Sequence, residues 1–296
     1  MPDSKKIDNG NIKIITENET GYEINSPLRK FINFFLIPIL NRLPRGLFIS
    51  SSKKAKTVHE HVTTYKALEV IYNFDHKLNF DKGILDGFFG YFWQTTNNAK
   101  ALRNRLKLVK KELVEAIHSA PTKKIRILSL ACGSIRAVIE IIGKFKENFD
   151  FEVFGVDKNQ DAIEYAQKLC RILNISHLMK WDQTTVVEFL SRNDLKFDII
   201  EMVGFLDYIK DEKAVDLFNK IYFTLGDSGV FITGNIKDNP ERKFVTEIVG
   251  WPGLIFRKES DLIKLIKNSK FRSSNVRIIY EPQNIHAIII VKKKSE

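Results

Sequence analysis

Small residues and an acid follow two apolar runs in the middle of the sequence. The first run, residues 125–130, leads into the small residues 131–134, and the second, residues 151–156, ends in Asp157, 24 positions after Gly133. A strand that ends in small residues can turn tightly into a helix, whose first N–H groups then face a polar or anionic ligand. An acid at the end of the neighbouring strand can accept hydrogen bonds from both hydroxyls of a ribose. The two runs therefore predict a site for a nucleotide-type cofactor.

The glycine pattern of this loop favours a nucleoside over a diphosphate. Gly133 is present, but Ala131 and Ile135 stand where a dinucleotide-binding loop has its outer glycines. Ile135 would crowd the close approach of a diphosphate, whereas a nucleoside requires a tight turn and a few backbone contacts. The loop resembles motif I of the class I S-adenosylmethionine-dependent methyltransferases, an apolar strand with an acid followed by Gly-x-Gly-x-Gly. In this sequence Ser129 replaces the acid.

The order of the following segments supports the resemblance. A helical pattern begins at a capping Asn159, and a helix is predicted over residues 211–225 before a strand over 230–235. Strand and helix alternate four times, which favours a parallel sheet with right-handed crossovers. Residues 275–280 and 285–291 then predict a final pair of strands. The resemblance implies an α/β, Rossmann-like class I methyltransferase domain over residues 120–296, with a mostly parallel seven-stranded sheet and a C-terminal antiparallel hairpin.

The resemblance also implies S-adenosylmethionine as the cofactor and assigns residues to it. The methionine portion would contact Ala131, Gly133 and Ser134, and the ribose would contact Asp157. Asp182 would accept the adenine amino group and Trp181 would lie along the adenine, although a helix cap and an ordinary core position are open alternatives for these two. Met202 and Val203 would close the other side of the cofactor.

The first 119 residues are predicted to form an extension to this domain. Residues 1–25 are polar and are expected to be flexible, and residues 26–119 are expected to form a helical cap that builds the substrate pocket. Within the cap, apolar spacing predicts helices over residues 57–74 and 97–118, with a connection over 75–90. The runs 64–70, 97–105 and 251–257 resemble a bacterial branch of the methyltransferases, which implies a small or lipid-like acceptor.

Residues 27–52 contain an apolar run, 31–40, flanked by Arg29, Lys30, Arg42 and Arg45. The run is shorter than the roughly 20 apolar residues that a membrane-spanning helix requires. Three interpretations remain open: a short helix that docks onto the catalytic domain or a second subunit, an amphipathic segment on a membrane surface, and a lid over an apolar substrate.

Charge and cysteine content narrow the function classes. The net charge is +11, but the lysines and arginines are scattered and are not interleaved with aromatic residues, so a nucleic-acid partner is disfavoured. The two cysteines, Cys132 and Cys170, lie in predicted apolar elements and offer no disulfide framework or metal site. We therefore expect no metal and a cytoplasmic location, with peripheral contact to the inner face of a membrane as an alternative. The sequence does not indicate the oligomeric state.

Catalysis requires mainly that the acceptor be aligned with the methyl group in a dry pocket. For a hydroxyl acceptor the candidate bases are Asp207, Tyr208, His59 and His61. For a carboxylate acceptor no base is required, and Arg257 or Arg105 would orient the acid. We therefore predict a methyltransferase that acts at oxygen on a small-molecule or lipid-like acceptor. The alternatives are a non-catalytic protein that binds S-adenosylmethionine or a nucleoside, and an RNA methyltransferase.

Overall fold

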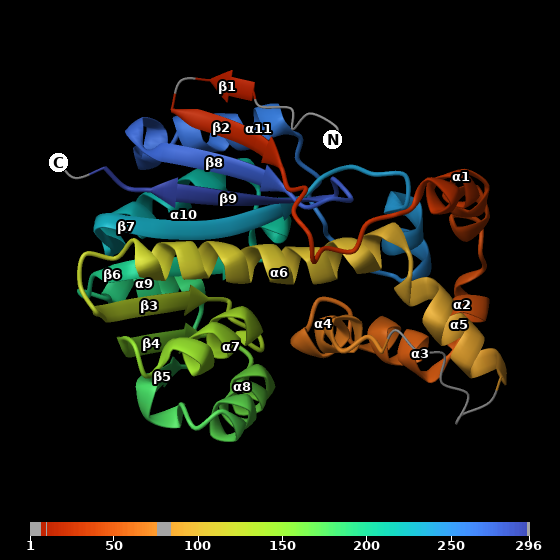
Figure 1. The fold of residues 1–296 in the computed structure, drawn as a ribbon, viewed down its shortest axis with the longest axis horizontal. Helices are drawn as coiled ribbons and strands as arrows, with labels where there is room; N and C mark the ends of the chain where they lie inside the picture. The colour runs from red at the N-terminus through yellow and green to blue at the C-terminus, as the bar shows by residue number, and fades with distance from the viewer. Residues whose placement is uncertain (1–6, 10, 76–83, 295–296) are drawn as a thin grey trace.

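A nine-stranded mixed sheet forms the centre of the computed structural model, which describes residues 7–9, 11–75 and 84–294. The spatial order is β1-β2-β8-β9-β7-β6-β3-β4-β5 (Figure 1). Neighbouring strands are parallel except at β9, which is antiparallel to both β7 and β8, and at β1, which is antiparallel to β2. The strands are β1 Ile7–Asn9, β2 Ile12–Thr16, β3 Lys124–Leu130, β4 Asp150–Val156, β5 Met179–Asp182, β6 Phe197–Val203, β7 Leu225–Ile236, β8 Asn275–Tyr280 and β9 His286–Lys292.

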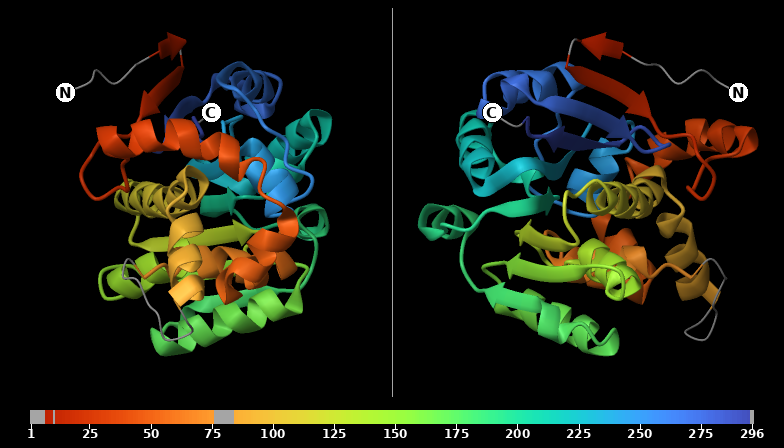
Figure 2. Two further views of the ribbon diagram at one scale, coloured as in Figure 1. Left: turned by 90° about the vertical axis from the view of Figure 1, so that its right-hand side faces the viewer. Right: turned by 60° about the vertical axis from the view of Figure 1, so that its left-hand side comes forward.

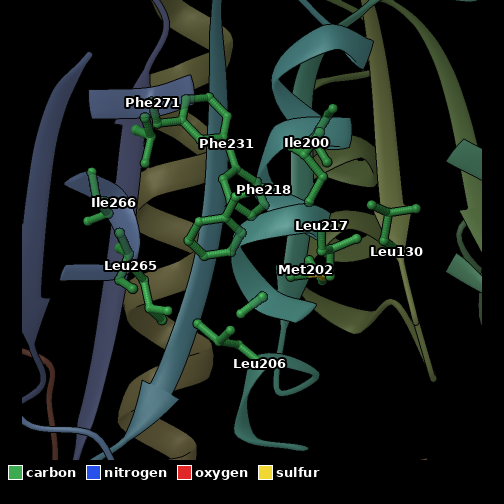
Figure 3. Close-up of a cluster of buried hydrophobic side chains, with 14 of the residues drawn as sticks. Leu130, Ile200, Met202, Leu206, Leu217, Phe218, Phe231, Leu265, Ile266 and Phe271 are labelled. Carbon is green, nitrogen blue, oxygen red and sulfur yellow. The ribbon is translucent and has the colours of Figure 1, made fainter. Parts of the chain in front are cut away.

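Helices cover both faces of this sheet, and each face has its own apolar core. Helices α6 (Asn97–His118), α7 (Arg136–Phe145) and α8 (Gln160–Ile172) pack on one face. Helices α9 (Val186–Arg192), α10 (Asp211–Thr224) and α11 (Glu259–Lys267) pack on the other, where Figure 3 shows Phe218, Phe231 and Phe271 together. Three 3-10 turns, Ser176–Leu178, Leu206–Tyr208 and Lys270–Ser273, lie among these described elements. The predicted α/β fold with its C-terminal antiparallel pair is confirmed.

The strand runs form a parallel sheet because they are apolar on both sides. In β3, Ile125, Ile127, Leu128 and Leu130 are all at most 1% exposed, as expected for a central parallel strand covered on both faces. Helix α8 begins at a polar cap, as predicted. Asn159 Oδ1 accepts from the N–H of Asp161 at the start of α8.

The N-terminal segment corrects one prediction. Residues 1–25 were expected to be flexible, but β2 pairs in parallel with β8 and extends the sheet beyond the predicted seven strands. Ile12 is fully buried and Ile14 is 7% exposed, so this strand contributes to the core. The partner strand lies more than 250 residues away in the sequence, and a five-residue run does not reveal such a pairing.

In the described residues the cap consists of five helices, which lie at the carboxyl end of the parallel strands (Figure 1). They are α1 Pro27–Leu40, α2 Arg45–Ser51, α3 Lys53–Glu60, α4 Tyr65–Tyr72 and α5 Ile84–Gln94. The single helix predicted over 57–74 is wrong, because the chain turns between α3 and α4, where Thr63 has a φ of 65°. Part of the predicted connection 75–90 belongs to α5, and residues 76–83 lie outside the described residues.

Helix α6 links the cap to the sheet. Its predicted bounds, 97–118, are confirmed. Leu108, Val109, Leu113 and Ile117 are at most 2% exposed and pack in the core between α6 and the sheet, while Ala99 packs with the cap helices. The predicted domain boundary near residue 120 follows α6 in the sequence. In the structure, however, α6 packs on the sheet of the domain that begins after this boundary.

Candidate cofactor and acceptor site

A cavity of about 820 Å³ lies where the cap meets the carboxyl ends of the parallel strands. Ligands of open α/β sheets bind at this edge. We call the part beside the loops after β3 and β4 and the start of α9 the first or cofactor half, and the part beside α6 and the segment 244–254 the second or acceptor half. Helix α4 borders both, with Tyr65 beside Gly133 and Tyr72 beside Arg105. Of the predicted site residues, the lining includes Ala131, Gly133, Ser134, Asp157, Val203, Asp207, Tyr208 and Arg105.

The loop after β3 keeps a tight turn without its outer glycines. Ala131, Gly133 and Ile135 all have left-handed φ values, of 50°, 53° and 46°, a region that favours glycine. The N–H of Ile135 donates to the carbonyl of Cys132 at 2.7 Å. Ile135 is 4% exposed and packs in the core formed with α6 and α7. The turn that a nucleoside needs is therefore present, and most of the isoleucine side chain is buried.

Asp157 ties the two cofactor loops together. One carboxylate oxygen accepts from the N–H of Gly133 at 2.8 Å, and the other accepts from the N–H of Asn159 at 2.9 Å. Each oxygen retains a second lone pair, so the carboxylate can still accept bonds from a ligand's hydroxyls.

Glu69 of α4 links the cap to this loop and was not predicted from the sequence. Ser134 Oγ donates to one carboxylate oxygen at 2.8 Å. Arg136 and Tyr165 donate to the other at 2.8 and 3.0 Å. Glu69 is 7% exposed. An acid among the apolar positions of the predicted helix was the available signal.

A second missed acid, Glu201 on β6, lies beside Ser129. The two residues are register partners across β3 and β6, and Ser129 Oγ donates to Glu201 at 2.5 Å. The other oxygen accepts from the N–H of Val203 at 3.0 Å. Glu201 lines the cavity at 8% exposure, and burial raises the pKa of its carboxyl group. The carboxyl group that motif I lacks at Ser129 is therefore supplied by the adjacent strand.

Six predicted residues lie outside the cavity lining, namely Trp181, Asp182, Met202 and Arg257 and the candidate bases His59 and His61. The ring of Trp181 packs over Gly155, where an added Cβ would lie 2.5 Å from Cζ3. Arg192 donates to both carboxylate oxygens of Asp182 at 2.6 Å. Met202 is fully buried against α10 in the opposite core (Figure 3).

The fourth residue, Arg257, is 2% exposed and holds neighbouring loop segments together. Its guanidinium donates to the carbonyls of Leu206 and Ile209, to Asn235 Oδ1 and to Asp211. No N–H of this guanidinium is free for an acceptor, and we withdraw the assignment.

Arg105 and Asp207 form the polar centre of the second half of the cavity. Arg105 Nη1 lies 4.0 Å from Asp207 Oδ2, and Nη2 donates to Tyr72 Oη at 3.2 Å. Arg105 Nε is buried and has no hydrogen-bond partner among the described residues. Burial raises the pKa of Asp207 to about 6, against the opposing effects of Arg105 and the N–H of Ile236.

Other polar groups around this centre are buried or engaged. Tyr208 Oη accepts from Trp251 Nε1 at 2.5 Å, and burial raises the pKa of Tyr208 to about 12. His286 is 3% exposed, and burial lowers its pKa well below the ordinary value. His59 Nδ1 bonds to the carbonyl of Val249, and neither His59 nor His61 is among the lining residues. Asp207 is therefore a candidate base that lines the cavity and whose pKa lies closer to neutral than that of Tyr208.

The remaining wall of the second half is apolar. It contains Trp93 from the cap, Leu102 from α6, and Val245, Val249 and Trp251 from the segment after β7, where Phe244–Ile248 forms a π-helical turn. Trp93 and Val249 are 5% and 7% exposed and also belong to the apolar core of the cap. This half suits a hydrocarbon group next to a single charged centre.

Comparison with known families decides the identity of this fold and site. A family model described as a methyltransferase domain matches residues 121–286. The chain is a class I S-adenosylmethionine-dependent methyltransferase. No curated protein matches the sequence.

Solved structures share the fold of this methyltransferase at low sequence identity. A possible exported protein from Bordetella parapertussis aligns with a TM-score of 0.64 at 12% identity, over 91% of this chain and 99% of its own. Magnesium protoporphyrin IX methyltransferase from Synechocystis PCC 6803, determined with bound S-adenosylhomocysteine, aligns with a TM-score of 0.53 at 14% identity, over 76% and 92%. An O-methyltransferase family protein from Burkholderia thailandensis aligns with a TM-score of 0.52 at 10% identity, over 90% and 70%.

Proposed function

We propose that this methyltransferase methylates oxygen on an apolar small molecule or lipid-like compound that carries a carboxylate. The observation that carries the proposal is the buried guanidinium of Arg105, which lines the cavity and whose Nε–H has no hydrogen-bond partner among the described residues. A buried donor without an acceptor costs roughly 1–3 kcal/mol. A bound carboxylate would satisfy this donor and pair with a second N–H of the same guanidinium.

The cofactor half would hold S-adenosylmethionine through residues that the described structure already positions. Asp157 would bind the ribose hydroxyls, and the backbone of Ala131 and Gly133 would contact the methionine portion. Glu201 would face the cationic end of the cofactor, because it is a buried carboxyl group with no ion-pair partner among the described residues. When bound, the cofactor supplies a methyl group that is already activated on a sulfonium.

The protein's own contribution is then alignment and exclusion of water. Arg105 would fix the acceptor's carboxylate, and Trp93, Leu102 and Val249 would bury its hydrocarbon part. A carboxylate is ionised at neutral pH and needs no base. Asp207 would balance the charge of Arg105. Walls closed by apolar side chains also favour a small molecule over RNA, which proteins bind in open basic grooves.

A hydroxyl acceptor is the second candidate, because Asp207 has the properties of a base for it. Its pKa of about 6 lies close to neutral pH, where a general base is most effective. The two candidates differ in which residue matters for binding and which for the chemical step.

The experiment is a screen of fatty and aromatic acids against the matching alcohols, followed by kinetics of two variants. For a carboxylate acceptor, Arg105→Gln should raise KM by roughly 10–100-fold, the range expected when a charged hydrogen bond is lost. Asp207→Asn should then leave most of kcat intact. For a hydroxyl acceptor, Asp207→Asn should lower kcat by about 100-fold or more. Wild-type kinetics in the Arg105→Gln variant with every acid would refute the carboxylate proposal.

A further inference from the structure

We propose that α1 and α2 form a docking surface for an anionic membrane. The α1–α2 surface is defined by exposed apolar side chains, which are Leu28, Phe31, Phe34, Phe35 and Ile39 of α1 and Leu47 of α2. Each of these is between 57% and 74% exposed. Helices α1 and α2 lie at the end of the molecule opposite the amino ends of the parallel strands, and α1 lies at the front in the left view of Figure 2.

Helix α1 presents its apolar face outward and a polar residue inward. Phe31, Phe34 and Phe35 point away from the body and contact one another edge to face, with centroids 5.3 Å apart for Phe31–Phe35 and 5.2 Å for Phe34–Phe35. Asn33 is 8% exposed and donates to Asn97 Oδ1 at 2.9 Å. A helix on the surface of a soluble domain normally has the opposite arrangement.

Polar contacts hold the helix pair in this orientation. Arg29 donates to the carbonyl and the hydroxyl of Thr95. Asn41 accepts from the N–H of Phe244 and donates to the carbonyl of Pro240. Arg45 donates to the carbonyl of Glu247 at 2.8 Å. The outward apolar face is therefore fixed by the fold.

The segment of the chain that carries this surface is positively charged. Residues 24–59 contain no Asp or Glu and seven basic residues, which are Arg29, Lys30, Arg42, Arg45, Lys53, Lys54 and Lys56. Lys30, Arg42, Lys53 and Lys54 are exposed and form no ion pair with any residue that the structure describes. Apolar aromatic residues bordered by unpaired basic residues match the interface of a membrane that contains anionic lipids.

The same charges argue against a second copy of the chain as the occupant. Two copies meeting through this surface would bring like charges together, which destabilises association. An anionic lipid surface has the complementary charge and receives the phenylalanines at its acyl boundary.

Helix α1 is too short to cross a bilayer. It has 14 residues and is about 21 Å long, whereas the hydrocarbon layer is about 30 Å thick. None of the helices described is long and apolar enough to span a bilayer alone, and α1 and α2 meet that test only together, with a 117° bend between them.

The inner side of the same helices leads to the acceptor half of the cavity. Leu40 and Phe48 are 7% and 2% exposed and pack in one cluster with Trp93, Phe244 and Val249. The last three also line the cavity. The α1–α2 surface and the acceptor half of the cavity therefore lie on two sides of one apolar cluster. Delivery of a lipid-like acceptor across this cluster rests on the proposed function, whereas membrane docking does not.

The test is sedimentation of the full chain with vesicles of phosphatidylcholine alone and of phosphatidylcholine with phosphatidylglycerol. We expect binding to the anionic vesicles and a steep loss of binding with added salt. The Phe31→Ser/Phe34→Ser variant should bind at least tenfold more weakly. Lys30→Gln and Arg42→Gln should each weaken binding about fivefold, the equivalent of ~1 kcal/mol for one basic residue near an anionic surface.

The matched control is Ile172→Ser/Val187→Ser, which removes apolar side chains that are 75% and 55% exposed on α8 and α9. This variant should bind the vesicles as wild type does. No binding, equal binding to both vesicle types, or a dimer in sedimentation equilibrium that Phe31→Ser/Phe34→Ser dissociates would overturn the proposal. Since the readout does not involve methyl transfer, failure here is distinguishable from failure of the proposed acceptor class.

Discussion

Replacing Asp157 with alanine removes two contributions that this carboxylate makes to the cofactor site. Its oxygens accept from the N–H groups of Gly133 and Asn159, and we propose that they also accept from the ribose hydroxyls. Hydrogen bonds to a charged group are worth roughly 1.5–3 kcal/mol. Asp157→Ala should therefore weaken binding of S-adenosylhomocysteine by about 10–150-fold. Part of that loss would come from the loop that Gly133 anchors.

Calorimetric titration with two ligands resolves the two contributions. The 2′,3′-dideoxy analogue of S-adenosylhomocysteine lacks the hydroxyls, so the direct contact is absent from its complex. If Asp157 binds the ribose, the alanine substitution should weaken the analogue much less than the parent, because two changes to one interaction are not additive. Equal losses for both ligands would show that Asp157 acts only through the loop. Asp161→Ala, at a 67% exposed side chain on the neighbouring helix, is the control and should bind as wild type does.

Three further predictions concern buried groups. Glu201→Gln should weaken S-adenosylmethionine and S-adenosylhomocysteine equally, by about tenfold or more, if the carboxylate faces their common ammonium group; loss confined to S-adenosylmethionine would instead indicate the sulfonium. Ile12→Ala should destabilise the protein by about 2–5 kcal/mol in denaturant unfolding, whereas exposed Lys13→Ala should not; equal midpoints would remove β2 from the core. Burial raises the pKa of Asp207 from 3.8 to about 6, so the protonated form favours folding and stability is lost as pH rises through 6. Asp207→Asn should therefore gain up to about 3 kcal/mol relative to wild type between pH 4 and pH 7, and a constant difference across that range would contradict the assignment.

The elements that the sequence predicted well are those whose signals are local. The strands of β3, β4, β8 and β9 are short apolar runs, and α6 has a continuous apolar face and an N-cap at Thr96. Strand β2 lacks such a signal, because its pairing depends on β8 at the far end of the chain. The break between α3 and α4 depends on one residue, Thr63, in a left-handed conformation. Apolar periodicity continues across that break and therefore predicts one helix.

In the site, too, the residues with a local sequence signal were predicted, and those that depend on contacts between distant segments were not. Gly133 and Asp157 follow their strands directly and were found from the sequence. Glu201 compensates for Ser129 through cross-strand register, which the sequence does not display. Trp181 has the residue type expected beside an adenine, but its ring packs on Gly155. Side-chain type alone cannot distinguish these two environments.

The altered glycine loop is explained by a balance of strain and burial at Ile135. A non-glycine residue at positive φ costs roughly 1–2 kcal/mol. Burying an isoleucine side chain contributes about 1.5–3 kcal/mol, and Ile135 is 4% exposed in the core that anchors α7. The two terms offset, so the turn persists without the third glycine. The glycine is needed where a diphosphate must approach the backbone, and a nucleoside sulfonium carries no phosphate. This methyltransferase can therefore replace the third glycine with isoleucine while it retains the turn, Gly133 and the carboxylate that accepts from the N–H of Gly133.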